Sequence, residues 1–194
     1  MLRKVVSLEN IKRPLLSICI PSFGRVSMLR NTLESIYADL NGVELDDFEV
    51  IVSDNDPQMS LHCLISEFTF PNFHYKSTTC SGFKNSLHAL SFGRGSLLKL
   101  HNNTMEFKSG SLCKLIQDVR DNIVDMPLIF YTNGLKRNHT VRRFSFFDDF
   151  IGELSYFSSW SNGFCVWNDD FTFDVTSEVD EFFPQTSILL SQYL

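Results

Sequence analysis

The chain of 194 residues carries 23 Asp and Glu against 17 Lys and Arg, and this acidic balance argues against a nucleic-acid-binding domain, which normally presents a basic face. Its length favours one domain with a single substantial core. The five cysteines form no C-x-x-C pair and no apolar run approaches the roughly 20 residues of a membrane span, so we expect a cytoplasmic protein without a disulfide framework or zinc site.

The first part of the chain alternates between short apolar runs and amphipathic segments. Residues 15–20 (LLSICI) and 48–53 (FEVIVS) are predicted to be buried strands, because each run is short, apolar and bounded by turn residues. Apolar residues at helical spacing predict a helix over 28–40, with Ser27 as its cap, and a second helix over 60–68.

The same alternation continues to about residue 135 and then weakens. Its predicted elements are a strand at 73–76, a helix at 81–92, a strand at 97–100, a helix at 110–123 and a strand at 127–132 (PLIFYT). Strands that alternate with helices form βαβ units. The sequence therefore predicts an α/β fold with a mostly parallel central sheet and helices on both faces.

Polar and aromatic residues follow the carboxyl ends of the predicted strands, where open α/β sheets bind their ligands. An aromatic ring could pack on a base, a carboxylate could accept a hydrogen bond from a base or ribose, and Lys or Arg could neutralise a diphosphate. No G-x-G-x-x-G or P-loop motif is present. The sequence thus indicates a nucleotide-diphosphate site of another kind, with the candidates Pro21, Ser22, Phe23, Arg25, Asp54, Asp56 and Lys84.

Three ordered motifs resemble those of family 2 glycosyltransferases over roughly residues 15–120. LSICIPSFGRVSMLRNTLESI resembles the opening strand and helix, EVIVSDND the second strand with its uracil-contacting Asp, and GFKNSLHALSFGRGSLLKL the segment leading to the metal-binding strand. The resemblance implies a Rossmann-like GT-A fold. It also implies transfer of a sugar from a nucleotide-sugar donor, above all a UDP-sugar, to an acceptor.

The resemblance also assigns roles to single residues. The residues Pro21, Ser22, Phe23 and Arg25 would surround the base and ribose, Asp54 would contact the base with Asp56 beside it, and Lys84 would lie near the diphosphate. A late carboxylate would deprotonate the acceptor hydroxyl, and the pair Asp180–Glu181 is the candidate.

The metal site of the family is altered in this sequence. Family members hold Mg²⁺ or Mn²⁺ with an Asp-x-Asp cluster, whereas Asn102 and Thr104 stand here in the stretch LHNNTMEF. Glu106 is the nearest acid and would share a side with them if the strand continued. Neutral oxygens bind a hard cation weakly. Three outcomes stay open: a weakly held metal, a diphosphate stabilised without metal, or a loss of activity.

The last part of the chain, about residues 155–190, resembles the acceptor-side half of bacterial polysaccharide glycosyltransferases. This predicts O-antigen or capsule synthesis on a glycan or lipid-linked acceptor. A lipid-linked acceptor would bring the protein to the inner face of the plasma membrane, where Lys136–Arg137 and Arg142–Arg143 could contact anionic lipids. The run from Trp160 to Phe164 could bind a sugar ring, or be a buried Trp followed by a turn.

One domain is predicted over residues 1–194, with a nucleotide-sugar-binding half at about 15–135 and an acceptor-side half at about 136–194. The length favours a short or truncated family member. A degenerate, non-catalytic member is therefore the alternative to an active enzyme. A nucleotidyltransferase would share the α/β plan but would need a Gly-rich basic loop soon after the first strand, and none is present.

Overall fold

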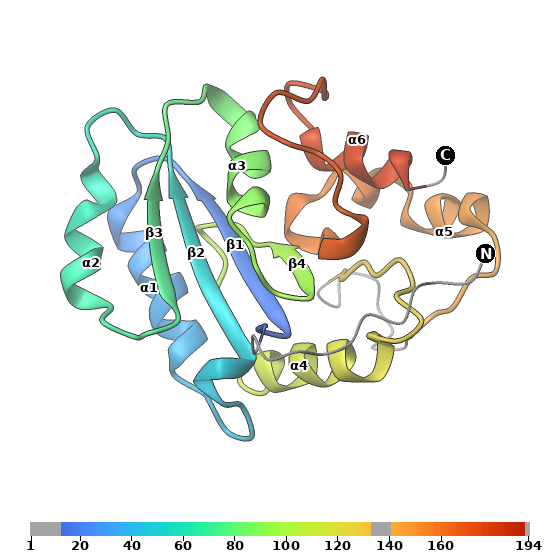
Figure 1. Cartoon of the computed structure of the whole chain (residues 1–194), viewed down its shortest axis with the longest axis horizontal. Helices are drawn as coiled ribbons and strands as arrows, with labels where there is room; N and C mark the ends of the chain where they lie inside the picture. Colours follow the sequence, from blue (N-terminus) through green and yellow to red (C-terminus); the bar gives the residue numbers. More distant parts are fainter. Residues whose placement is uncertain (1–12, 133–140, 193–194) are drawn as a thin grey trace.

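The computed structural model describes residues 13–132 and 141–192, and a five-stranded sheet forms its centre (Figure 1). The strand order is β3-β2-β1-β4-β5, with β1 to β4 parallel and β5 antiparallel to β4. The strands are β1 (Leu16–Ser22), β2 (Phe48–Asp54), β3 (Phe73–Ser77), β4 (Leu97–Leu100) and β5 (Cys165–Trp167). The prediction of a mostly parallel α/β sheet is confirmed.

Helices cover both faces of this sheet because residues buried on both sides alternate along each strand. In β1, Ile18 and Ile20 pack with α1 and α4 in one core cluster, and Cys19 packs with α3, α5 and α6 in the other. The helices are α1 (Val26–Tyr37), α2 (Leu64–Glu67), α3 (Asn85–Ser91), α4 (Ser111–Asn122), α5 (Phe147–Leu154) and α6 (Pro184–Ser191). Among the described helices, none has the length and apolar character needed to cross a bilayer.

The predicted strand at 127–132 is wrong. This half-buried segment makes one isolated antiparallel bridge, between Phe130 and Phe164, and the short strand β5 pairs with β4 instead. Two hydrogen bonds hold the segment alongside β5, from Trp167 Nε1 to Pro127 O at 2.8 Å and from Tyr131 N to Gly163 O at 2.9 Å. A Cβ on Gly163 would lie 2.2 Å from the Phe130 ring, so this close approach requires glycine.

The start of α1 also differs from the prediction. The helix begins at Val26 and its N-cap is Arg25, with no side-chain cap, so Ser27 does not cap it. Gly24 and Arg25 both have a positive φ of 58°, which turns the chain sharply from the end of β1 into the helix. A left-handed conformation is uncommon for Arg, and strain of this kind clusters at functional sites.

Candidate functional site

A cleft of about 1140 Å³ opens at the carboxyl ends of the parallel strands, and we call it the carboxyl-end cleft. Open α/β sheets bind ligands at this edge because successive βα loops converge there. One wall comes from the segments that follow β1, β2, β3 and β4, and the other comes from the chain near Trp160 and from the turn before α6. The lining includes Pro21, Ser22, Phe23, Arg25, Asn55, Phe83, Asn85, Asn102, Thr104, Trp160, Phe182 and Gln185.

The end of β1 brings its four predicted residues to this cleft together. Pro21 and Ser22 are the last residues of the strand, Phe23 is 60% exposed, and Arg25 is exposed beside it. Arg25 is the one charged side chain among the described residues that line the cleft. Its guanidinium can donate several hydrogen bonds to a phosphate oxygen. This edge therefore offers an aromatic face and a cation side by side.

The two predicted carboxylates after β2 lie outside the cleft lining. Asp54 is fully buried, and its carboxylate accepts hydrogen bonds from Tyr75 Oη at 2.6 Å and from the backbone N of Asp56 at 2.9 Å. Asp56 accepts from Gln58 N at 3.0 Å and from Ser60 Oγ. Burial and the hydrogen bond to Asp54 raise the pKa of Tyr75. Both acids organise the turn, and their contact with a base stays a prediction.

Two asparagines that were not among the predicted site residues connect the strand ends. Asn85 is buried; its Nδ2 donates to Ser53 O at 2.7 Å, to Asn55 Oδ1 at 3.1 Å and to Ser22 O at 3.3 Å. Asn55 Nδ2 in turn donates to Cys80 O at 3.1 Å. These bonds hold the ends of β1 and β2 and the segment before α3 in one arrangement. A polar residue at the start of a helix that follows a strand is the signal that could have indicated Asn85.

Lys84 precedes α3 and is exposed, outside the cleft lining, although its neighbour Phe83 lines the cleft and is 60% exposed. The Phe83 ring faces Phe182 from the other wall, with ring centroids 6.5 Å apart. Trp160 lines the same wall and is half-buried. The mouth of the cleft is therefore aromatic on both sides. The role of Lys84 at a diphosphate stays a prediction.

The predicted metal ligands separate at the end of β4. Asn102 and Thr104 line the cleft, but Glu106 does not. The strand ends at Leu100 and the chain then turns, with Met105 N donating to Asn102 O at 3.1 Å, so the alternation that would place Glu106 beside the other two does not apply. Over residues 13–132 and 141–192, no group of three His, Cys, Asp or Glu could hold a metal. The described donors do not fit a Mg²⁺ or Mn²⁺ site.

His101 lies beneath this turn as a buried structural residue. Its Nε2 donates to Met105 O at 2.8 Å, and its ring lies 4.7 Å from that of Phe107. Burial, with the nearby Lys99 as a second cause, lowers the pKa of His101 to about 3. The ring is therefore neutral at pH 7, with its proton on Nε2 and with no partner for Nδ1 among the described residues.

The predicted catalytic pair is exposed at the turn before α6, next to the cleft but outside its lining. Asp180 Oδ1 accepts hydrogen bonds from Phe182 N at 2.9 Å and Phe183 N at 2.8 Å, which fixes the turn that carries both rings to the cleft. Glu181 is exposed. No described residue of the cleft lining is a carboxylate. The role of Asp180 and Glu181 as a base stays a prediction.

The basic pairs of the sequence lie away from this cleft or beyond the described chain. Lys136 and Arg137 fall outside the described residues. Arg142 forms an ion pair with Glu153 at 2.8 Å, and Arg143 is exposed. Contact of these residues with a lipid surface stays a prediction.

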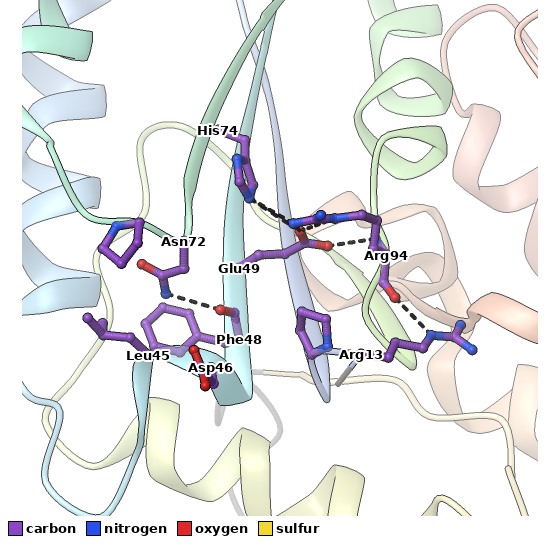
Figure 2. Close-up of a pocket in the computed structure, with 10 residues that line it drawn as sticks. Arg13, Leu45, Asp46, Phe48, Glu49, Asn72, His74 and Arg94 are labelled. Carbon is purple, nitrogen blue, oxygen red and sulfur yellow. Dashed lines mark hydrogen bonds and ion pairs between the residues drawn. The ribbon is translucent and has the colours of Figure 1, made fainter. Parts of the chain in front are cut away.

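A second hollow, of about 500 Å³, lies at the amino ends of the strands and is called here the amino-end hollow (Figure 2). Figure 2 shows His74 and Arg94 turned toward Glu49, whose side chain is 1% exposed. Glu49 accepts hydrogen bonds from Ser17 Oγ and Arg94 N at 2.6 Å each and from Arg94 Nη2 at 2.9 Å. Both carboxylate oxygens are thus occupied by protein donors. The functional candidate is the carboxyl-end cleft.

Comparison with known proteins identifies the class of fold. No protein-family model and no curated protein matches the sequence. Among solved structures, TarS 1-349 from S. aureus in complex with UDP-GlcNAc is similar over 92% of this chain and 53% of that chain, with a TM-score of 0.61 and 15% identity. A mannosyltransferase from Pyrobaculum calidifontis in complex with GDP-Man and Mn²⁺ is similar over 95% of this chain and 54% of that one, with a TM-score of 0.59 and 15% identity.

These similarities show that the chain has a GT-A-type fold, as the sequence predicts. The chain spans about half the length of both solved structures.

Proposed function

We propose that this chain is a glycosyltransferase of the family 2 type, which moves a sugar from a nucleotide-diphosphate-sugar donor to a glycan or lipid-linked acceptor. The observation that carries the proposal is the carboxyl-end cleft of a GT-A-type fold, with the exposed Phe23 ring and the Arg25 guanidinium at the end of β1. An aromatic face suits a base, and a guanidinium suits a phosphate. A UDP-sugar is the donor we favour.

The proposed division of labour follows the two walls of the cleft. The half at about 15–135 binds the nucleotide, with Pro21, Ser22 and Phe23 at the base and ribose. The half at about 136–194 binds the acceptor, and the aromatic residues Trp160 and Phe182 support this assignment because sugar rings pack on aromatic faces. Bacterial O-antigen or capsule synthesis, with peripheral contact at the inner membrane face, is the setting we propose.

In the proposed reaction, a carboxylate takes the proton of the acceptor hydroxyl as its oxygen attacks the anomeric carbon and the nucleoside diphosphate leaves. Asp180 and Glu181 are the proposed candidates, because the turn that they begin carries Phe182 and Phe183 into the cleft. Arg25 would stabilise the charge that develops on the leaving diphosphate.

A calorimetric titration tests the nucleotide site. We expect UDP to bind the purified chain and Phe23→Ala to weaken binding roughly tenfold, the order found for one base stacked on an aromatic ring. Phe146→Ala is the matched control, since Phe146 is 73% exposed and lies outside the cleft lining. Equal affinities for the wild type and both variants would place the base elsewhere. No binding of UDP or GDP would contradict the proposal as a whole.

A non-catalytic nucleotide-binding protein is the second candidate, favoured by the lack of carboxylates among the described residues of the cleft lining. The two candidate functions differ in whether the chain consumes a sugar donor. The first predicts release of UDP from a UDP-sugar when an acceptor glycan is added, and its loss in an Asp180→Asn, Glu181→Gln double variant. Nucleotide binding without any release over a panel of donors and acceptors favours the second.

A further inference from the structure

Lys99 of β4 is a buried lysine beneath the carboxyl-end cleft, and burial lowers the pKa of its ammonium group. The residue is 3% exposed, and its Nζ donates to Asn162 O at 2.7 Å and to Leu100 O at 3.0 Å. The ring centroid of Tyr131 lies 5.7 Å from Nζ. Within residues 13–132 and 141–192, no carboxylate lies within ion-pair distance of this ammonium group. The buried Glu49, by contrast, is paired with Arg94 at 2.9 Å.

A buried charge without a counter-charge is costly, because the protein interior solvates it less well than water. The two strand neighbours of Lys99 in register are Ile18 and Cys165, and both are buried, so an apolar residue would suit this position. Two carbonyl oxygens satisfy hydrogen bonds of the ammonium group but supply no negative charge. An anion bound from outside the chain would therefore favour the charged form of Lys99 and be stabilised by it.

Asn162 connects Lys99 to the cleft through hydrogen bonds to Lys99 and to Asn102. Its carbonyl oxygen accepts from Lys99 Nζ, while its side-chain Oδ1 accepts from the backbone N of Asn102 at 2.9 Å. Asn102 lines the cleft, and its own Oδ1 accepts from Ser161 Oγ at 2.7 Å. The Nδ2 of Asn162 is buried with no partner among the described residues. Positive charge and an unused donor thus lie behind the turn in which acidic metal ligands were expected.

We propose that Lys99, together with Arg25 at the cleft surface, balances the charge of a bound nucleotide diphosphate, in place of a divalent cation. The proposal rests on the proposed function and deepens it, because it states how this cleft compensates its anionic ligand. Lys99 acts on the ligand through the Asn162–Asn102 pair and not by direct contact, so it is a positioning and charge-balancing residue. Substitution of Lys99 should therefore change the affinity for ligands that carry phosphates and leave the affinity for the nucleoside alone unchanged.

The first test is a titration of the wild-type chain with UDP, once in excess EDTA and once in Mn²⁺. The expected result is the same Kd within about threefold in the two buffers. Binding that is tenfold or more tighter with Mn²⁺ would overturn the inference while leaving the nucleotide site intact. No binding of UDP or GDP in either buffer would overturn the proposed function and this inference with it.

The second test neutralises the buried charge with Lys99→Met, in parallel with Lys114→Met, which removes an exposed charge on α4. Lys99→Met is expected to weaken UDP binding roughly tenfold, the order of one unit charge acting through a partly buried path, and to leave uridine binding unchanged. Lys114→Met is expected to change neither. An equal loss for UDP and uridine would indicate a structural role and overturn the inference, as would no loss.

Lys99→Arg completes the set because it keeps the charge, and it is expected to keep UDP binding within about threefold. Thermal unfolding of each variant shows that the binding data come from folded protein. We expect Lys99→Met to melt no lower than the wild type, since it removes an uncompensated buried charge. If it does not fold, the comparison of EDTA with Mn²⁺ and the Lys99→Arg titration decide the question.

Discussion

At the amino ends of the strands, donors from Ser17 and Arg94 enclose Glu49. At the carboxyl ends, the described residues that line the cleft supply amides, hydroxyls, aromatic rings and one charge, that of Arg25. The two regions lie at opposite edges of the same sheet but differ in residue type. In the amino-end hollow, donors of the protein itself occupy both carboxylate oxygens of Glu49. In the carboxyl-end cleft, donors and a cation stay available, which is what a ligand site requires.

A cluster of charged side chains is therefore weak evidence for a ligand-binding site. Glu49 and Arg94 form a conspicuous ion pair with His74 beside it, yet the partners of both charged groups lie within the protein (Figure 2). Among the described residues, the carboxyl-end cleft is lined by one charged side chain, Arg25, which forms no ion pair there.

Gly95→Ala should break the amino-end hollow most severely. An added Cβ would lie 2.5 Å from Ser17 N and 2.7 Å from Leu16 C, and backbone atoms cannot move aside without disturbing β1. We expect a loss of about 3 kcal/mol in the free energy of unfolding, measured by urea denaturation. Gly82→Ala is the control at the cleft, where φ is 56° and no atom lies within 4 Å, and should cost about 1 kcal/mol. Equal losses would contradict the packing argument.

Arg94→Ala removes one partner of the buried Glu49 carboxylate and should destabilise the chain by about 1–3 kcal/mol. Arg30→Ala is the control, because Arg30 pairs with Glu67 on the surface, with exposed fractions of 35% and 38%. The surface pair should contribute less than the buried one, because water screens it. Urea midpoints of the two variants test the contrast. A larger loss for Arg30→Ala would mean that burial does not set the strength of these pairs.

Asn102→Asp places a carboxylate in the charge-poor cleft. We expect UDP binding in EDTA to weaken roughly tenfold by like-charge repulsion, and Mn²⁺ to restore it, because a carboxylate oxygen is a stronger ligand for a hard cation than an amide oxygen. Asn122→Asp on the last turn of α4 adds the same charge away from the cleft and should change neither value. Unaltered binding by Asn102→Asp would place the diphosphate away from this turn.

The smallest effect concerns pH and stability. Burial would raise the pKa of Glu49, but hydrogen bonds from Ser17 and Arg94 outweigh it and hold that pKa below its ordinary value. The unfolded chain therefore binds the proton first, so the stabilisation is present above the unfolded-state pKa and is lost as pH falls through the folded-state pKa. Urea midpoints at pH 7 and pH 4 should show a fall that is smaller in Arg94→Ala. An equal fall in both proteins would assign the effect to other acids.

Much of the fold was predictable from residue patterns, because strand and helix periods are local properties. The runs LLSICI and FEVIVS are buried strands at nearly the predicted bounds, and β1 to β4 pair in parallel as their alternation with helices requires. The same logic placed Phe23 and Arg25 at the carboxyl-end cleft, since residues that follow parallel strands meet at one edge.

Other features were decided only by contacts between distant segments. β5 has three residues, too few to show a period, and its pairing with β4 depends on a turn at Asn162–Gly163 that accommodates the Phe130 ring. The position of Asp54 in a turn-like sequence suggests a solvent-exposed carboxylate. In the structure this carboxylate is buried and accepts a hydrogen bond from Tyr75 of the neighbouring strand.

Lys99 is the clearest case in which the sequence alone did not predict the surroundings of a side chain. In the stretch LLKL a lysine on a strand suggests a side chain that reaches water, because long charged side chains usually do. Pairing of β4 with β5 and the carbonyl oxygen of Asn162 bury it instead. Local patterns in the sequence identified the four parallel strands and the edge of the sheet that carries the cleft, but not β5. The tertiary structure decided which polar groups are paired and which remain available, because pairing depends on residues that lie far apart in the chain.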